Sequence, residues 1–284
     1  MKIITGDKFQ DICQVSFSKL EHKKFETENK SIESHDIDTF DFDNYDNPSL
    51  VYINSSLLNR TKPKLVESKL YEKLQKFKNP FNIIFHNSDD SFDDVHLDLF
   101  EIPNINRIFS QNVNTVHERL TPIPIGLANR RWEWGNLEYF KSIIEQNIPK
   151  TQHIYFNFEL LGGNRKYWRP LCYAAGVRLD IKESKKLPFK EYVPALASNR
   201  FCLSPEGNGI DCHRMWECLY LKVIPICHRN ILTEYFAKYF PIVLVDDWNK
   251  FELSDLEGVY ENANWKNYYL LDFDLYIKHI KLND

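Results

Sequence analysis

The sequence predicts an α/β fold in which two halves of the chain each form a parallel β-sheet. Short β-type runs alternate with helical stretches along most of the 284 residues, which is the pattern of parallel sheets with crossover helices. The length suits one large domain or two of about 140 residues. A hydrophobic content of 43%, with 14% aromatic residues, is enough to bury real cores.

In the first half, the expected strands are residues 1–5, 50–54, 81–86, 107–110 and 123–125, and a helix is expected over 64–77. Each strand contains a short apolar run. The stretch 19–47 is polar and acidic, and its pattern indicates no element.

In the second half, the expected strands are 153–158, 177–181, 200–204, 223–227 and 242–245, and the helices between them are 164–175, 189–198, 211–221 and 231–239. Parallel strands that alternate with helices in this way predict a doubly wound domain. The final stretch 264–281 is amphipathic, which favours a helix that packs back on the first half. We therefore expect domains at 1–130 and 131–262, with the returning helix in 263–284.

The formal net charge of −4 gives no reason to expect a nucleic-acid partner. The arginines are unevenly spread, because ten of the eleven fall between Arg107 and Arg229. This concentration favours a site for an anionic ligand. The alternative is that about half of these arginines are solvated surface residues.

The six cysteines form no CxxC pair and no regular disulfide framework, which fits a reducing compartment. Two Cys-His pairs, at 212–213 and 227–228, match no standard zinc spacing, and no metal is expected. The N-terminus lacks the apolar core of a signal peptide, and no apolar run is long enough to span a membrane. We expect a cytoplasmic protein. Richness in Asn, Lys and Ile is typical of an AT-rich genome, such as that of a large DNA virus or a protist. For a virus-encoded protein, the compartment would be the host cytoplasm.

The clearest motif, over residues 201–217, runs from an apolar strand through a glycine turn into a helix. The strand ends at Ser204, and the turn Gly207-Asn208-Gly209 is expected to adopt positive φ and to let a ligand approach the backbone. Asp211 is the expected N-cap of the helix. Helical periodicity separates an apolar stripe (Cys212, Met215, Trp216, Leu219) from a polar side (His213, Arg214, Glu217).

This arrangement suits a phosphate group, because exposed amides and the positive end of a helix attract anions. Arg214 can add a bidentate contact worth roughly 1.5–3 kcal/mol. Glu217 can accept hydrogen bonds from ribose hydroxyls. The alternative is a plain strand–turn–helix unit whose charged side chains face water.

Residues 201–230 resemble the C-terminal donor-site motif of the exostosin-like glycosyltransferases, a family with relatives in large DNA viruses and eukaryotes. Two further segments strengthen the resemblance: residues 123–129, followed by Trp132 and Gly135-Asn136, and residues 86–89, at the end of an expected strand. The resemblance covers roughly residues 81–248, and the first eighty residues add nothing specific to it.

The resemblance implies an α/β fold of the GT-B type, with two Rossmann-like domains facing an interdomain cleft. It implies transfer of a hexose or pentose from a nucleotide-diphosphate sugar, UDP being favoured, to a glycan hydroxyl, with inversion and without a metal or other cofactor. Glu217 would bind the ribose, and the diphosphate would lie on Arg214, the 207–211 loop and the arginines that follow the 162–163 glycine turn. The implied donor-binding residues are Arg165, Arg169, Ser204, Gly207, Asn208, Gly209, Ile210, Asp211, His213, Arg214 and Glu217.

An inverting transfer needs a base within reach of the acceptor hydroxyl. Asp89 is the first candidate and His86 the second, because their segment follows the apolar run 81–85 and should stand at a strand's carboxyl end. The alternative is a polar loop with capping aspartates. The aromatic rings of Trp132, Trp134 and Trp168 could stack on a sugar or base, or fill cores.

Three alternatives stand beside metal-independent glycosyl transfer. Metal-dependent glycosyl transfer uses an Asp-x-Asp motif, which occurs at 36–38, 41–43 and 272–274, but none of the three ends a buried strand of a nucleotide-binding unit. A non-catalytic nucleotide- or sugar-binding module is the second alternative. A nucleotide-sugar epimerase or dehydrogenase would need Gly-x-Gly-x-x-Gly after the N-terminal strand, and only Gly6 lies near it.

Overall fold

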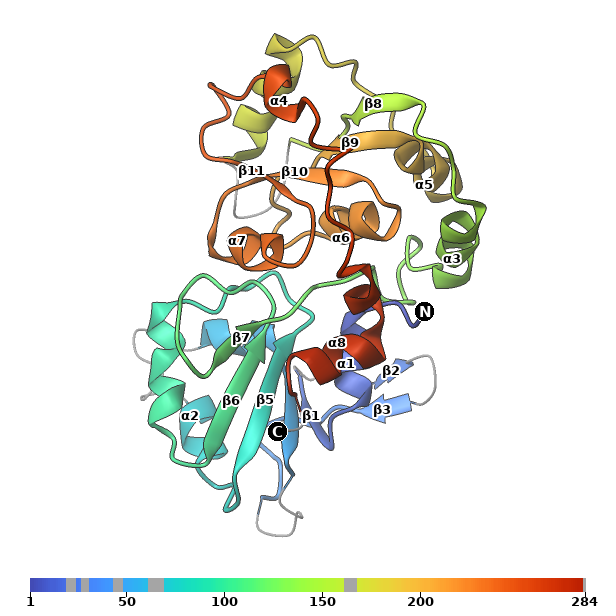
Figure 1. Ribbon diagram of the computed structural model, residues 1–284. Helices are drawn as coiled ribbons and strands as arrows, with labels where there is room; N and C mark the ends of the chain where they lie inside the picture. The colour runs from blue at the N-terminus through green and yellow to red at the C-terminus, as the bar shows by residue number, and fades with distance from the viewer. Residues whose placement is uncertain (19–23, 27–30, 43–47, 61–68, 161–167, 283–284) are drawn as a thin grey trace. The chain divides into compact units, whose positions relative to one another are not determined.

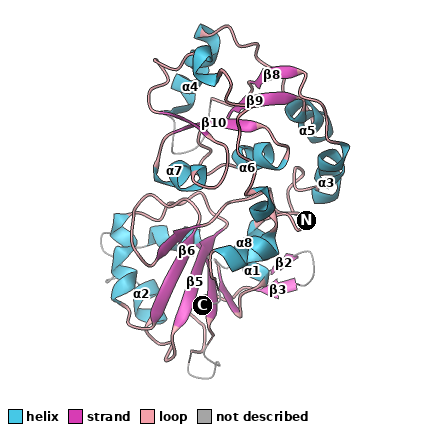
Figure 2. Ribbon diagram, in the orientation of Figure 1, coloured by secondary structure: helices cyan, strands magenta, loops and turns pink. Residues whose placement is uncertain are grey.

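The computed structural model describes residues 1–284 except 19–23, 27–30, 43–47, 61–68, 161–167 and 283–284 (Figure 1). The chain divides into two compact units. The first unit is Lys2–Ile125 together with Asp272–Asp284, and the second unit is Gly126–Leu271 with Met1. Both are mixed α/β units in which helices lie beside the strands of a sheet (Figure 2).

The first unit contains a five-stranded sheet in the order β1-β4-β5-β6-β7, and every pair is parallel. Its strands are β1 Val15–Phe17, β4 Leu50–Asn54, β5 Phe81–His86, β6 Ile105–Ser110 and β7 Leu120–Pro122. All residues of β4 and β5 are buried, as expected for inner strands that are covered on both faces. The register sets Asn54 opposite His86 at their carboxyl ends.

The other elements of the first unit are α1 Gly6–Asp11, α2 Lys69–Leu74, α8 Phe273–His279, the 3₁₀ helices η2 Ser55–Arg60 and η4 Asp94–Glu101, and an antiparallel pair, β2 Lys24–Glu26 and β3 Ser31–Glu33. The C-terminal helix α8 packs within this unit, where the ring of Phe273 meets that of Phe9 edge-on at 5.2 Å. The Asn82 side chain also donates a 3.0 Å hydrogen bond to the Leu282 carbonyl.

Three expectations for this unit need correction. Residues 1–5 are not a strand, because Ile3 makes only an isolated bridge to Asp272 and Thr5 is already the N-cap of α1. The first strand is instead β1, which is too short to give a periodic pattern. The last strand, β7, lies before residues 123–125. The final helix occupies only Phe273–His279 rather than 264–281, because the residues before it form turns and the 3₁₀ helix η6 Tyr268–Leu271.

The second unit contains a four-stranded parallel sheet in the order β11-β10-β9-β8. Its strands are β8 Gln152–Tyr155, β9 Asn199–Leu203, β10 Ile224–His228 and β11 Val243–Val245. Its helices are α3 Leu137–Gln146, α4 Trp168–Arg178, α5 Phe189–Ala197, α6 His213–Tyr220 and α7 Ile231–Ala237, with the 3₁₀ helices η5 Leu253–Leu256 and η6 Tyr268–Leu271. Trp216 of α6 is fully buried, and its ring meets that of Phe236 edge-on at 4.7 Å.

The strand expected over 177–181 is wrong. Helix α4 continues through Gly176 to Arg178, and it ends where Asp180 takes a left-handed conformation with φ of 53°. The chain beyond it still runs beside the end of β8, because the Ser184 amide donates to the Phe156 carbonyl at 2.7 Å. Strand order follows chain order in both sheets, so the described strands lack the reversal of a doubly wound sheet.

No helix in the described part of the chain is both long enough and apolar enough to cross a membrane.

Candidate functional site

The carboxyl ends of the four strands of the second unit lie at one edge of the sheet, because all the strands are parallel. Ligands of open α/β sheets bind at this edge. The segments that follow the strands are residues 156–160, 204–212, 229–230 and 246–248. They contain most of the expected donor-binding residues.

The loop after β9 is closed tightly onto the start of α6. Ser204 is buried, and its amide donates to the Ile226 carbonyl at 2.9 Å. A Cβ atom at Gly207 would lie 3.2 Å from the Cβ of Cys212 and 3.3 Å from the carbonyl oxygen of Asp211. A larger residue here would therefore be tightly packed, and its neighbours would have to shift by a few tenths of an ångström.

The expected positive φ in this loop is wrong. Among the described residues, the glycines with positive φ are Gly126 and Gly258, and neither Gly207 nor Gly209 is one of them. Ile210, which follows, is buried at 3% exposure and belongs to the core. The loop therefore owes its shape to close packing and not to left-handed glycine conformations.

Arg169 of α4 crosses to this loop. Its Nε donates to the Glu206 carbonyl at 2.9 Å, and its Nη2 lies 3.4 Å from Oδ1 of Asn208. Nη1 also lies 3.4 Å from the Glu159 carbonyl, after β8. The guanidinium thus joins the segments after β8 and β9. Arg165, the other arginine expected on this side, lies outside the described residues.

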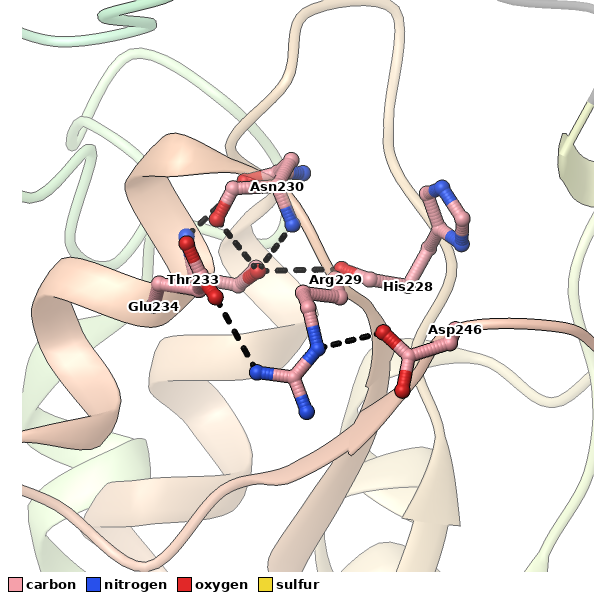
Figure 3. Close-up of polar contacts among 6 residues, drawn as sticks. All are labelled: His228, Arg229, Asn230, Thr233, Glu234 and Asp246. Carbon is pink, nitrogen blue, oxygen red and sulfur yellow. Dashed lines mark hydrogen bonds and ion pairs between the residues drawn. The ribbon is translucent and has the colours of Figure 1, made fainter.

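A second connection joins the loop after β9 to the segment after β10. Asn230 donates to Oε1 of Glu206 at 2.8 Å, and the same side chain accepts from the Thr233 amide as the N-cap of α7. Arg229 forms ion pairs of 2.5 Å with Asp246 and 3.1 Å with Glu234 (Figure 3). The segment after β10 is therefore held rigidly on both sides.

The ring of His228 points away from this network (Figure 3) and stacks on Trp168, with ring centroids 3.5 Å apart. Burial lowers the pKa of His228. Glu206, His228 and Asn230 were not among the expected site residues. Their place directly after β9 or at the end of β10 was the available signal, because polar residues that end apolar strands fall at the ligand-binding edge.

Asp211 is not the N-cap of α6. The N-cap is Cys212, which makes no capping hydrogen bond with its side chain. Oδ1 of Asp211 instead accepts from the Trp216 indole at 2.9 Å and from the Cys212 amide at 2.8 Å. The carboxylate is buried. There it accepts a hydrogen bond from an indole N–H that would otherwise lack a partner in the core.

Arg214 and Glu217 lie together on α6 and are joined through Tyr192 of α5. The Tyr192 hydroxyl donates to Oε2 of Glu217 at 2.6 Å. Nε of Arg214 lies 3.5 Å from the same hydroxyl, and its Nη1 donates to the Asn157 carbonyl after β8. Burial, with the Glu217 charge beside it, raises the pKa of Tyr192. The hydroxyl therefore stays protonated and remains a donor.

This network leaves two polar atoms unused. Within the described part of the chain, Oε1 of Glu217 accepts no hydrogen bond and Nη2 of Arg214 donates none. A carboxylate oxygen and a guanidinium nitrogen held on one helix can bind hydroxyls and phosphate oxygens respectively. Tyr192 was not an expected site residue, and nothing in its sequence neighbourhood identifies it.

His213, the first residue of α6, contacts the start of the second unit. Its Nδ1 lies 2.8 Å from the carbonyl oxygen of Gly126. A carbonyl only accepts, so Nδ1 carries the proton and donates. In the neutral ring, Nε2 is then the acceptor nitrogen.

In the first unit, the two candidate bases differ. His86 is fully buried, its Nε2 donates to the Pro124 carbonyl at 3.0 Å, and its Nδ1 accepts from the Asn87 amide at 2.8 Å. Asp89 is exposed. The loop between them is fixed, because Gln111 accepts from the Asn87 amide at 2.9 Å. Asp89 is therefore the more accessible of the two to an acceptor.

All six cysteines are free thiols. In the described part of the chain, no three His, Cys, Asp or Glu side chains gather as a metal site would require. Two of the Asp-x-Asp patterns serve local structure: Asp36 accepts from the Asp38 amide at 3.0 Å, and Asp272 caps α8. The third includes Asp43, which lies outside the described residues.

Neither a scan against protein-family models nor a search of curated proteins finds a match to this chain.

Proposed function

We propose that this protein is a glycosyltransferase of the exostosin-like, GT-B type, with two Rossmann-like domains. It moves a sugar from a nucleotide-diphosphate sugar, UDP being favoured, to a glycan hydroxyl with inversion. No metal takes part. The donor binds the carboxyl edge of the sheet in the second unit.

The observation that carries the proposal is the pair of arginines at this edge. Arg169 joins the segments after β8 and β9, and Arg214 joins α6 to the segment after β8. Two guanidinium groups around a glycine loop supply the positive charge that a leaving diphosphate needs, and preorganised charge of this kind is the largest single contribution in many enzymes. Beside the two arginines, Glu217 accepts hydrogen bonds from the ribose hydroxyls through Oε1, because Tyr192 occupies Oε2.

In the proposed reaction, the oxygen of the acceptor hydroxyl attacks the anomeric carbon, and Asp89 accepts the proton of that hydroxyl. The bond from that carbon to the diphosphate oxygen breaks, and the nucleoside diphosphate leaves with the electron pair. Arg169 and Arg214 stabilise the negative charge that develops on the leaving group. Attack on the face opposite the leaving group inverts the anomeric configuration.

The test is a thermal-shift and turnover assay with UDP, GDP and their sugars. A ligand at 100 times its dissociation constant adds about 2.7 kcal/mol to stability. We expect UDP to stabilise the wild type. In Glu217→Ala, loss of a charged acceptor weakens binding roughly tenfold to a hundredfold.

Turnover should survive EDTA. Chelation that abolishes turnover, with manganese restoring it, contradicts the metal-free mechanism. Binding without turnover on any acceptor identifies a non-catalytic module.

A further inference from the structure

Two tryptophan rings are exposed side by side in the second unit. Trp132 and Trp134 are each 48% exposed. Their ring centroids are 5.6 Å apart and their planes differ by 5°. The guanidinium of Arg131 lies 5.6 Å from the centroid of the Trp132 ring. Tryptophan usually buries most of its large apolar surface, so a pair left in water indicates a binding surface.

The turn that presents the rings is fixed at both ends. The Trp132 amide donates to the Asn129 carbonyl at 3.0 Å, and the Gly135 amide donates to the Trp132 carbonyl at 2.9 Å. A Cβ atom at Gly135 would lie 2.1 Å from the Asn129 carbonyl oxygen, so only glycine fits. Asn136 then caps α3 by accepting from the Tyr139 amide. The backbone that carries the two rings is therefore fixed before any ligand binds, which lowers the entropic cost of binding.

We propose that Trp132 and Trp134 form a platform for a sugar ring of a glycan. The electron-rich face of an indole attracts positively polarised C–H groups, which a pyranose carries on its flat face. The hydroxyls around that ring need donors and acceptors. Arg130, Arg131 and Glu133 are all exposed beside the tryptophans and supply both.

A sugar fits this surface better than a protein partner does. Glutamate is depleted in the cores of protein interfaces, whereas here the exposed Glu133 stands between the two tryptophans in the chain. Along the described chain, the nearest exposed large hydrophobic residues before and after the pair are Val116 and Leu160. Within the described chain, the turn itself therefore exposes two large apolar side chains, Trp132 and Trp134.

The turn is linked to the proposed donor site. His213, at the start of α6, binds the Gly126 carbonyl at 2.8 Å, and Gly126 begins the segment that leads into the turn. We assign the glycan on this platform as the acceptor of the transfer, and this assignment rests on the proposed function. Sugar binding by the two rings does not rest on it.

The test follows the two indole N–H signals by NMR in isotope-labelled full-length protein, with signals assigned from Trp132→Phe and Trp134→Phe. Cello-, chito- and xylohexaose and a heparin hexasaccharide are added separately. We expect at least one to shift both signals saturably. Affinity should fall about tenfold in the double alanine variant, because both stacked rings are lost. Trp134→Phe should retain binding, and Tyr269→Ala, which removes another exposed aromatic ring of this unit, should not change it.

Three results overturn the platform: no saccharide shifts the signals, uridine shifts them instead, or the double alanine variant turns a dimer into a monomer. These outcomes are separable from the fate of the proposed function. Glycan binding in a protein that binds no nucleoside diphosphate keeps the platform and removes the transferase. UDP binding with unmoved indole signals keeps the transferase donor site and removes the platform.

Discussion

The hydroxyl of Tyr192 donates a 2.6 Å hydrogen bond to Oε2 of Glu217, from one helix of the second unit to another. Glu217 is only 7% exposed, so this bond fixes the carboxylate in one orientation and leaves Oε1 for a ligand. The ring of Tyr192 also lies 5.8 Å from the Arg214 guanidinium. One tyrosine thus positions both of the α6 side chains assigned to the donor.

Tyr192→Phe should therefore damage both stability and binding. A buried carboxylate that loses a donor costs about 1–3 kcal/mol, which urea unfolding would measure. UDP affinity should fall several-fold, because Glu217 loses its fixed orientation. Tyr139→Phe, which removes an exposed hydroxyl bonded to the Lys190 carbonyl, is the matched control. Equal effects of the two variants would contradict the positioning role.

Arg169→Lys should weaken binding of UDP but not of uridine. Lysine keeps the charge but loses the planar fork that reaches Glu206 and Asn208 together. The expected loss is roughly tenfold for the diphosphate. Arg178→Lys is the control, because Arg178 lies on the same helix and pairs with Glu252. An unchanged UDP affinity in Arg169→Lys, measured by calorimetry, would remove this arginine from the site.

Asp89→Asn should lower kcat by roughly 10²–10⁴ while the dissociation constant of UDP barely changes. The amide keeps the shape and one acceptor oxygen but cannot take the proton. His86→Gln is the comparison. Burial of His86 predicts that this change mainly lowers the free energy of unfolding. If His86→Gln folds normally and loses turnover while Asp89→Asn does not, the base is His86.

The free energy of unfolding should fall above about pH 8.5. Burial raises the pKa of Cys212 to about 11 and that of Cys172, Cys218 and Cys227 well above its ordinary value. The unfolded chain releases these protons near pH 8.5 and the folded chain keeps them. The unfolded state then binds fewer protons, so stability is lost as pH rises.

Lys150 acts in the opposite sense. Burial lowers its pKa to about 8, so the folded state releases this proton at a lower pH than the unfolded state does. The free energy of unfolding therefore gains from Lys150 between about pH 8 and about pH 10.4. One lysine cannot offset four cysteines. Urea unfolding under reducing conditions at pH 8, 9 and 10 measures the slope. Cys172→Ala should flatten it by about 1.4 kcal/mol per pH unit. A stability that holds constant or rises over this range contradicts the buried-thiol assignment.

The inner strands were predictable because their residues are apolar and buried on both faces. Leu50–Asn54 and Phe81–His86 match the expectation residue for residue. The strand predicted over 177–181 was wrong because a glycine, here Gly176, is typical of the end of a helix. In the structure this glycine lies within α4, where a Cβ atom would come 2.7 Å from the ring of Phe156. Close packing between distant residues requires the glycine, and no local pattern reveals that.

The candidate site divides in the same way. The glycine loop and the polar side of α6 could be predicted, because they follow one another in the chain. The partnership of Arg214 and Glu217 with Tyr192 could not, since Tyr192 lies on α5 and only tertiary packing brings it to α6. Asp211 was predicted to cap α6 because it lies just before that helix in the chain. Its actual partner, the Trp216 indole, depends on how the core is filled.

A crystal structure of the UDP complex tests the central claim most directly, which is that a nucleoside diphosphate binds the carboxyl edge of the second unit's sheet. The predicted result places the diphosphate within hydrogen-bonding distance of Arg169 and Arg214, beside Gly207–Gly209, and a ribose hydroxyl on Oε1 of Glu217. UDP bound only to the first unit, or bound to the second unit away from Arg169 and Glu217, would contradict the account.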